Sequence, residues 1–198
     1  MPGIIKPYWE FLPMKSEEAS SDFRPAVRFV VIFVLLYLAG NSIYGIWIER
    51  VKPAPDLITR MVSDQVAFLL AFFEPDVRTS ISTSEPLVLL SHTGGTVIRV
   101  FEGCNGINVM IVFLAFLAAT GGQAKRLIKF SVIGLVIIHV TNLIRVSLLY
   151  LAALYQPLWF YYIHKYLFTA ALYATVFLLW YIWIKNTMQN QENASASE

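Results

Sequence analysis

The chain has 198 residues, of which 57% are hydrophobic and only 14% are charged, and its formal net charge is +2. Its mean hydropathy of +0.61 is too high for a soluble domain of this length, so the composition predicts an integral membrane protein. The small net charge and the dispersed basic residues exclude a nucleic-acid-binding surface.

The first predicted element is a membrane-spanning helix from Ala26 to about Ile48. It has the roughly 20 apolar residues that a bilayer core requires. Residues 1–25 precede it as a charged segment, which we expect on the cytoplasmic side. Because a cleavable signal peptide has a shorter apolar run of about 7–15 residues, we interpret this helix as a signal anchor that the mature protein keeps.

Residues 49–104 are predicted to lie outside the cytoplasm, and they begin with a short amphipathic helix at Thr59–Phe73. At about 1.5 Å per residue this helix is too short to cross a bilayer core of about 30 Å. We therefore expect it to lie in the membrane interface. Its apolar stripe is expected to comprise Met61, Val62, Val66, Leu69, Leu70 and Phe73.

Three stretches with β-type sequence follow the interfacial helix. They are Val77–Thr83, Leu87–Ser91 and Thr96–Phe101. The dipeptide Gly94-Gly95 between the last two is typical of a hairpin turn. We therefore predict a small extracytoplasmic β-hairpin that leads the chain to Cys104 at the membrane surface.

Three further apolar stretches predict membrane spans at Asn105–Thr120, Leu127–Leu154 and His164–Ile184. The basic turn at residues 121–126 is expected in the cytoplasm by the positive-inside rule. Four spans with both termini cytoplasmic satisfy this orientation, and residues 186–198 then form a disordered cytoplasmic tail. The predicted fold is an all-α integral membrane domain, residues 26–185, with about four transmembrane helices, the interfacial helix and the hairpin.

Cys104, Arg145 and His164 are predicted to lie at one depth near the extracytoplasmic boundary. Arg145 stands about 27 Å above Leu127 at about 1.5 Å per residue, and the other two residues begin their spans on that side. A nearby arginine and a helix N-terminus both lower the pKa of a thiol. We therefore expect Cys104 to attack, His164 to move the proton and Arg145 to stabilise the thiolate or an oxyanion.

Each of these residues also has a simpler interpretation. Arg145 can snorkel to the head groups, His164 can belong to an aromatic belt at the interface, and a lone cysteine can be structural. Asn142, one turn before Arg145 on the same helix face, favours a protein-facing or water-facing position for the pair. His139 is expected to be a packing or supporting histidine outside the site, and His92 to be solvated at the hairpin turn.

Three motifs resemble, in order and spacing, those of the exosortase/archaeosortase family of integral membrane cysteine transpeptidases. They are Glu102-Gly103-Cys104-Asn105-Gly106-Ile107, then Asn142-Leu143-Ile144-Arg145, then His164. The resemblance covers roughly residues 55–185, and the chain looks like a short member with fewer spans. We expect the three catalytic candidates to be supported by Glu102, Asn105 and Asn142, with Glu102 as the next candidate for the proton acceptor.

The resemblance implies that the cysteine forms a thioester with the cleaved protein, which an amine or hydroxyl acceptor then resolves. The implied substrates are exported proteins whose C-terminal sorting signal combines a short motif such as Pro-Glu-Pro, a transmembrane helix and a basic end. We expect a multi-pass protein of the cell (inner) membrane, embedded in the lipid bilayer, with its active site on the extracytoplasmic side and with no metal and no cofactor.

Two other interpretations remain open. In the first, the chain is a non-catalytic membrane assembly factor for an export or polysaccharide system, and its polar residues form an interhelical hydrogen-bond knot. The second is a small transporter subunit, although the chain shows neither an inverted repeat nor an acidic residue within a span. Fast alkylation of Cys104 near neutral pH would favour the enzyme, because a structural thiol reacts slowly.

Overall fold

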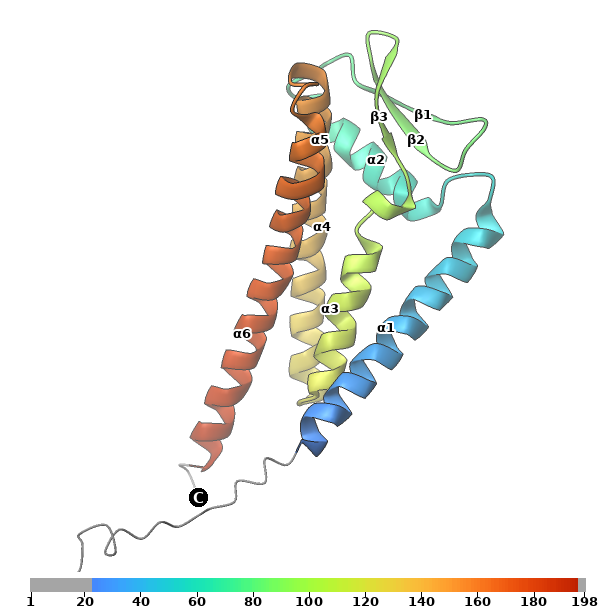
Figure 1. Ribbon diagram of the computed structural model, residues 1–198. Helices are drawn as coiled ribbons and strands as arrows, with labels where there is room; N and C mark the ends of the chain where they lie inside the picture. The colour runs from blue at the N-terminus through green and yellow to red at the C-terminus, as the bar shows by residue number, and fades with distance from the viewer. Residues whose placement is uncertain (1–22, 196–198) are drawn as a thin grey trace, which may run out of the picture.

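The computed structural model describes residues 23–195 of the chain. Long helices run from one end of the molecule to a small sheet at the other (Figure 1). We call these two ends the sheet end and the opposite end. The mainly helical architecture with one small β element confirms the coarse form of the predicted fold.

Three helices in the described part are long and apolar enough to cross a membrane. They are Arg24–Val51, Ala124–Tyr155 and Phe160–Gln189. The first two are α1 and α4, and the third joins α5 (Phe160–Tyr162), the π-helix η3 (Ile163–Phe168) and most of α6 (Thr169–Ser195). The chain therefore has the architecture of an integral membrane protein.

The remaining predicted span is a shorter helix, α3 (Ile107–Thr120), of 14 residues. At about 1.5 Å per residue it is about 21 Å long, which is less than the roughly 30 Å of a bilayer core. It begins two residues later than predicted because Asn105 and Gly106 form the turn that starts it. The structure thus shows three full-length apolar helices and one short one.

Helix α2 (Leu57–Leu70) packs against α4 and the sheet. Its buried face comprises Thr59, Val62, Ser63, Val66 and Leu70. Of the predicted stripe, Val62, Val66 and Leu70 lie on this buried face, whereas Met61, Leu69 and Phe73 are exposed on the surface of the protein. Two polar residues join the buried face because Asp56 accepts a hydrogen bond from the Thr59 hydroxyl, and the Thr59 carbonyl accepts one from Ser63 Oγ at 2.8 Å.

The three strands β1 (Arg78–Ile81), β2 (Val88–His92) and β3 (Gly95–Val100) form an antiparallel sheet in that order. The predicted hairpin is β2–β3, and β1 extends it. Its turn is Thr93-Gly94 rather than Gly94-Gly95. Both turn residues have positive φ, 47° and 87°, as a two-residue type I′ turn requires.

Two hydrophobic clusters hold the molecule together. The first lies at the sheet end and joins α2, the sheet and α4 through residues such as Val66, Leu90 and Tyr150. The second joins α3, α4 and α6 nearer the opposite end and includes Phe113, Ile138 and Trp183. A site between the sheet and the top of α4 is therefore supported from both sides.

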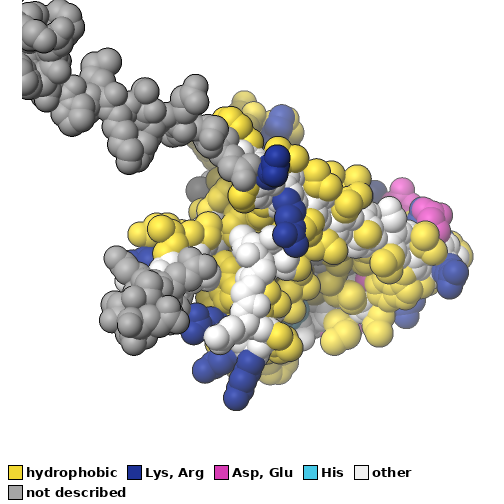
Figure 2. Space-filling view, turned by 90° about the horizontal axis from the view of Figure 1, so that it is seen from below, with side chains coloured by type: hydrophobic (Ala, Val, Ile, Leu, Met, Phe, Trp, Pro, Cys, Tyr) yellow, Lys and Arg dark blue, Asp and Glu magenta, His cyan; other side chains and the backbone are white. Residues whose placement is uncertain are grey.

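The opposite end is basic. The turn that carries Lys125 and Arg126 lies there, and Figure 2 shows Lys and Arg side chains around a largely hydrophobic surface. Helix α6 continues to Ser195, so the predicted disordered tail is helical up to that residue. The continuation is reasonable because extending an existing helix costs far less than starting one. Residues 1–22 of the predicted charged segment, which ends at residue 25, lie outside the described residues.

Candidate functional site

A cavity of about 430 Å³ lies at the sheet end, between β3, the loop that follows it, α4 and the start of the last long helix. Cys104, Arg145 and His164 all line it. The structure thus brings together, at a single cleft, the three residues that the sequence placed at one depth. Among the described residues that line the cavity there is no carboxylate.

Cys104 ends the short helix η2 (Glu102–Cys104) immediately before the turn into α3. Its backbone N–H donates to the carbonyl of Phe101 at 2.8 Å. Its own carbonyl accepts a hydrogen bond from Asn142 Nδ2 at 3.0 Å. The turn that carries the thiol is therefore held in place by the hydrogen bond from Asn142 on α4.

Asn105 is fully buried and anchors this turn without lining the cavity. Its Nδ2 donates to the Tyr44 hydroxyl at 2.5 Å and to Thr59 Oγ1 at 3.0 Å, and its Oδ1 accepts from the N–H of Ile107 at 3.0 Å. Asp56, which caps α2, accepts a hydrogen bond from the Thr59 hydroxyl. Asn105 therefore links α1, α2 and α3 directly behind the cysteine.

Arg145 and Asn142 act together on α4, as their spacing predicted. Arg145 Nη1 donates to Asn142 Oδ1 at 3.2 Å, while Asn142 is fully buried and bonds the Cys104 carbonyl. Arg145 Nε is buried and has no hydrogen-bond partner among the described residues. Arg145 also lines the cavity, which favours the protein-facing position over snorkelling to the head groups.

His164 lies in η3, where the helix widens to a π-helical turn. Its ring stacks on Phe160 with the centroids 5.8 Å apart and the planes 8° apart. Its Nδ1 is buried with no partner in the described part of the chain. Tyr161, Tyr162 and Tyr166 around it are exposed, whereas His164 lines the cavity.

The thiol is harder to ionise than the sequence indicated. Burial raises the pKa of Cys104, which lies before α3, above its ordinary value, and the charge of Glu102 adds to this, whereas Arg145 acts in the opposite direction. The expected low pKa was therefore wrong, because the cost of burying a thiolate exceeds the stabilisation from one arginine. This direction favours the protonated thiol over the thiolate in the resting site.

We expect alkylation of Cys104 by iodoacetamide to be slow at neutral pH and to accelerate as the pH rises. The alkylation rate near neutral pH therefore no longer distinguishes the enzyme from a protein with a structural cysteine. Arg145→Gln should move this profile to higher pH, because it removes the charge that lowers the pKa. Glu102→Gln should move it to lower pH, because it removes a charge that raises the pKa. Mass spectrometry of the purified protein over a pH series measures the profile. Identical profiles for both variants would contradict this electrostatic account.

The other candidate residues fall outside the cavity. His139 Nε2 lies 2.9 Å from Gln65 Oε1, which confirms a packing role between α4 and α2. His92 is half-buried rather than solvated, with its Nδ1 enclosed. Glu102 is half-buried in η2, beside Cys104, and does not line the cavity.

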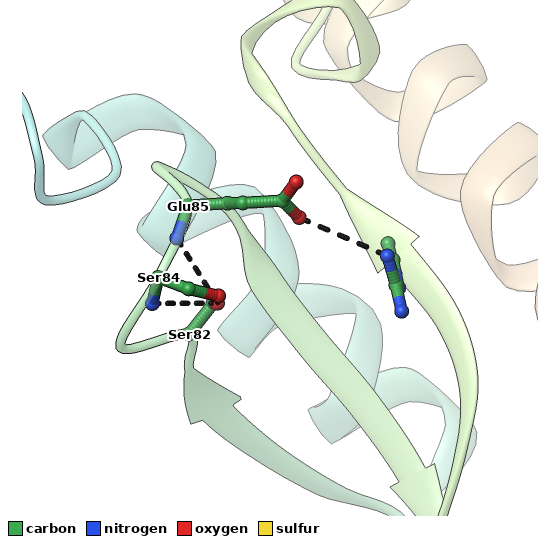
Figure 3. Close-up of polar contacts among 4 residues, drawn as sticks. Ser82, Ser84 and Glu85 are labelled. Carbon is green, nitrogen blue, oxygen red and sulfur yellow. Dashed lines mark hydrogen bonds and ion pairs between the residues drawn. The ribbon is translucent and has the colours of Figure 1, made fainter.

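Arg99 on β3 is a cavity residue that the sequence analysis missed. Its Nη1 lies 3.7 Å from Glu85 Oε2. Figure 3 shows Glu85 reaching toward β3 from the β1–β2 turn, where Ser82 Oγ accepts hydrogen bonds from the N–H groups of Ser84 and Glu85. The signal in the sequence was weak, because nothing showed which face of β3 would meet α4.

Gly106 is required by both its conformation and its surroundings. Its φ is +85°, and a Cβ there would meet Asn142 Cγ at 3.1 Å. Gly94 has a similar φ of +87° but nothing within 4 Å of an added Cβ. Substitution of Gly94 would therefore strain the backbone alone, whereas substitution of Gly106 would also crowd Asn142.

Gly106→Ala and Gly94→Ala should each lower the free energy of unfolding by about 1–2 kcal/mol, the cost of the left-handed conformation for an L-residue. Only Gly106→Ala should also change the alkylation rate of Cys104, because it displaces the Asn142 side chain that bonds the Cys104 carbonyl. Thermal unfolding in detergent and alkylation kinetics measure the two effects. Equal alkylation rates in both variants would show that Asn142 does not position the thiol.

Comparison of the chain with protein-family models, with curated proteins and with solved structures finds no match. The function therefore has to be inferred from the geometry of the cavity and the chemistry of the residues that line it.

Proposed function

We propose that the chain is an exosortase-like membrane cysteine transpeptidase or protease that cleaves C-terminal sorting signals of exported proteins through a thioester. One observation carries the proposal. A thiol, a guanidinium and an imidazole from three separate segments line one cavity.

The meeting of three chemically complementary groups at one cavity supports this proposal over a non-catalytic assembly factor. A buried polar atom without a partner costs about 1–3 kcal/mol, and such atoms in folded proteins call for an explanation such as catalysis or a bound group. The hydrogen bonds around Asn105 form a structural network, and Asn105 lies outside the cavity. Among the described residues Arg145 Nε and His164 Nδ1 have no hydrogen-bond partner, but neither have three buried atoms outside the cavity, His92 Nδ1, Ser147 Oγ and Trp180 Nε1. The unpaired atoms therefore support the proposal only together with the shared cavity.

The raised pKa of Cys104 makes the proton transfer part of the reaction. His164 takes the thiol proton as the sulfur attacks the scissile carbonyl carbon, and Arg145 stabilises the oxyanion that develops. The tetrahedral intermediate collapses, the C–N bond breaks, and the leaving amine takes the proton from His164. This step leaves the acyl group on Cys104 as a thioester.

The second half of the reaction releases the acyl group. An amine, a hydroxyl or water attacks the thioester carbonyl and gives its proton to His164. The C–S bond breaks, and the thiolate recovers the proton from His164. An amine or hydroxyl acceptor gives transpeptidation or esterification, and water gives hydrolysis.

The proposed location follows from the basic opposite end. With the turn at Lys125 and Arg126 in the cytoplasm, the sheet end and its cavity lie on the extracytoplasmic side of the cell membrane. The substrate's transmembrane helix would then lie in the bilayer beside the enzyme, with its scissile bond at the height of Cys104.

The experiment that tests the proposal compares the C-termini of exported proteins, by mass spectrometry, in cells with and without the chain. We expect some exported proteins to keep a C-terminal helix and basic end when the chain is absent. Wild-type protein should restore processing and Cys104→Ala should not. Restoration by Cys104→Ala would favour the assembly factor, and unchanged C-termini would overturn the proposal.

A further inference from the structure

Strand β3 is an edge strand that opens onto the cavity. In the described part of the chain only β2 pairs with it. Its consecutive residues Thr96 to Val100 line the cavity that also holds Cys104. Among the described residues, no backbone group of β3 forms a hydrogen bond outside the sheet.

An unpaired strand edge is a template for a further strand, and proteins usually cover or distort such edges. The pairing of Leu90 with Ile98 and of Ser91 with Thr96 leaves Val97 as an extra residue, which makes a bulge. Bulges increase the local twist and occur often beside active sites. Val97 lines the cavity, so the bulge lies where a bound chain would pass.

We propose that β3 is the docking strand for the substrate, which binds as an added β-strand along this edge. The inference rests on the proposed function, because it assigns the segment that precedes the scissile bond to β3. The occupant is an extended stretch of polypeptide on the acyl side of that bond. Its backbone supplies the N–H and C=O groups that pair with β3.

The path of the chain sets the direction of this pairing. Strand β3 runs from Gly95 at the hairpin turn to Val100, and the chain then reaches Cys104 through Phe101 and η2. Figure 1 shows this descent from the tip of the hairpin to the top of α3. A substrate whose reacting carbonyl lies at Cys104 and whose preceding residues lie along β3 therefore runs parallel to β3.

The dimensions and charges of the cavity select the kind of segment. A helix with side chains is about 10–12 Å across, whereas a paired strand lies about 4.8 Å from its neighbour. Only an extended segment can approach the β3 edge closely enough to pair. Arg99 and Arg145 line the cavity without a carboxylate among the other lining residues, so a Lys or Arg side chain in the segment is disfavoured.

Backbone methylation of a reactive peptide tests the pairing without altering the protein. The probe is N-acetyl-tetra-alanine chloromethyl ketone, which places an acyl-side peptide in front of a group that alkylates Cys104. Four further probes each carry one N-methyl group at a successive residue. Mass spectrometry of the purified protein in detergent gives the rate of Cys104 labelling, with iodoacetamide as the control for intrinsic thiol reactivity.

In a β-strand only alternate residues direct their N–H groups to a given neighbour. We therefore expect alternate N-methyl probes to label Cys104 about tenfold more slowly than the parent, which is the scale of one lost backbone hydrogen bond. The other probes should label at nearly the parent rate.

Equal rates for all four methylated probes would overturn the docking assignment. Rates that fall as the protein concentration rises would also overturn it, because β3 would then pair with β3 of a second copy. Neither outcome bears on the thiol chemistry, which the Cys104→Ala restoration experiment tests separately. Loss of the proposed function would appear there even if the alternating pattern were found.

Discussion

Replacing Cys104 by serine should lower processing of a sorting signal by about 10³-fold or more, the scale seen when a nucleophile is removed from other enzymes. The hydroxyl keeps the size and polarity of the side chain, but it is far less acidic than a thiol, and burial raises even the thiol pKa. His164 would have to remove a much less acidic proton during attack. Quantitative immunoblotting of the processed and unprocessed substrate measures the change.

The Cys104→Ser protein should stay folded and in the membrane. Cys104 is only half-buried, and the apolar area that holds the helices together lies elsewhere. Its thermal unfolding in detergent should therefore match that of the wild type within about 0.5 kcal/mol. Normal processing by a folded Cys104→Ser protein would exclude the thiol as the nucleophile.

Replacing His164 by glutamine should reduce turnover by about 10²–10⁴-fold, the usual contribution of a positioned general base. Glutamine keeps a hydrogen-bonding side chain of similar reach but cannot take a proton near neutral pH. The wild-type rate should rise and fall with pH, and the His164→Gln rate should lose the dependence that the imidazole supplies.

His139→Gln is the matched control for this prediction. It removes the second imidazole at a position that contacts Gln65 and lies outside the cavity. Its turnover should stay within about twofold of the wild type, as for other substitutions away from the reacting groups. If both glutamine variants kept normal turnover, the proton acceptor would have to be sought elsewhere, beginning with Glu102.

The sequence was sufficient to predict the meeting of Cys104, Arg145 and His164. Long apolar runs can form only helices in a bilayer, and counting residues along them gives heights directly. Polar side chains at the same height on separate segments are expected to face the protein interior rather than lipid, and therefore to face one another. The i−3 spacing of Asn142 and Arg145 likewise gave their contact from local geometry alone.

The hydrogen bonds of the turn at Asn105 could not be predicted in this way. Asn105 bonds Tyr44, 61 positions away, and Thr59, 46 positions away, and no local pattern encodes such approaches. The polar part of the buried face of α2 was also missed, because Thr59 is buried through hydrogen bonds with Asp56 and with Asn105, which lies 46 positions away. Arg99 was missed because alternation along a strand does not identify which neighbour covers each face.

The direction of the Cys104 pKa shift shows how burial can reverse a pairwise argument. Arg145 lowers the pKa of Cys104, as the sequence predicted, but the sequence could not indicate that burial raises this pKa by more. Removing water penalises the charged form more than the arginine favours it. In the proposed reaction the thiol is therefore activated by a base during attack and is not stored as a thiolate.

The thioester on Cys104 is the central claim, and hydroxylamine tests it most directly. Hydroxylamine attacks a thioester and leaves a hydroxamate on the acyl group. Processing of a sorting signal in its presence should give a product whose new C-terminus is a hydroxamate, detected by mass spectrometry, with wild-type protein and not with Cys104→Ser. A product with only a free carboxylate, formed equally by both proteins, would contradict an acyl-enzyme at Cys104.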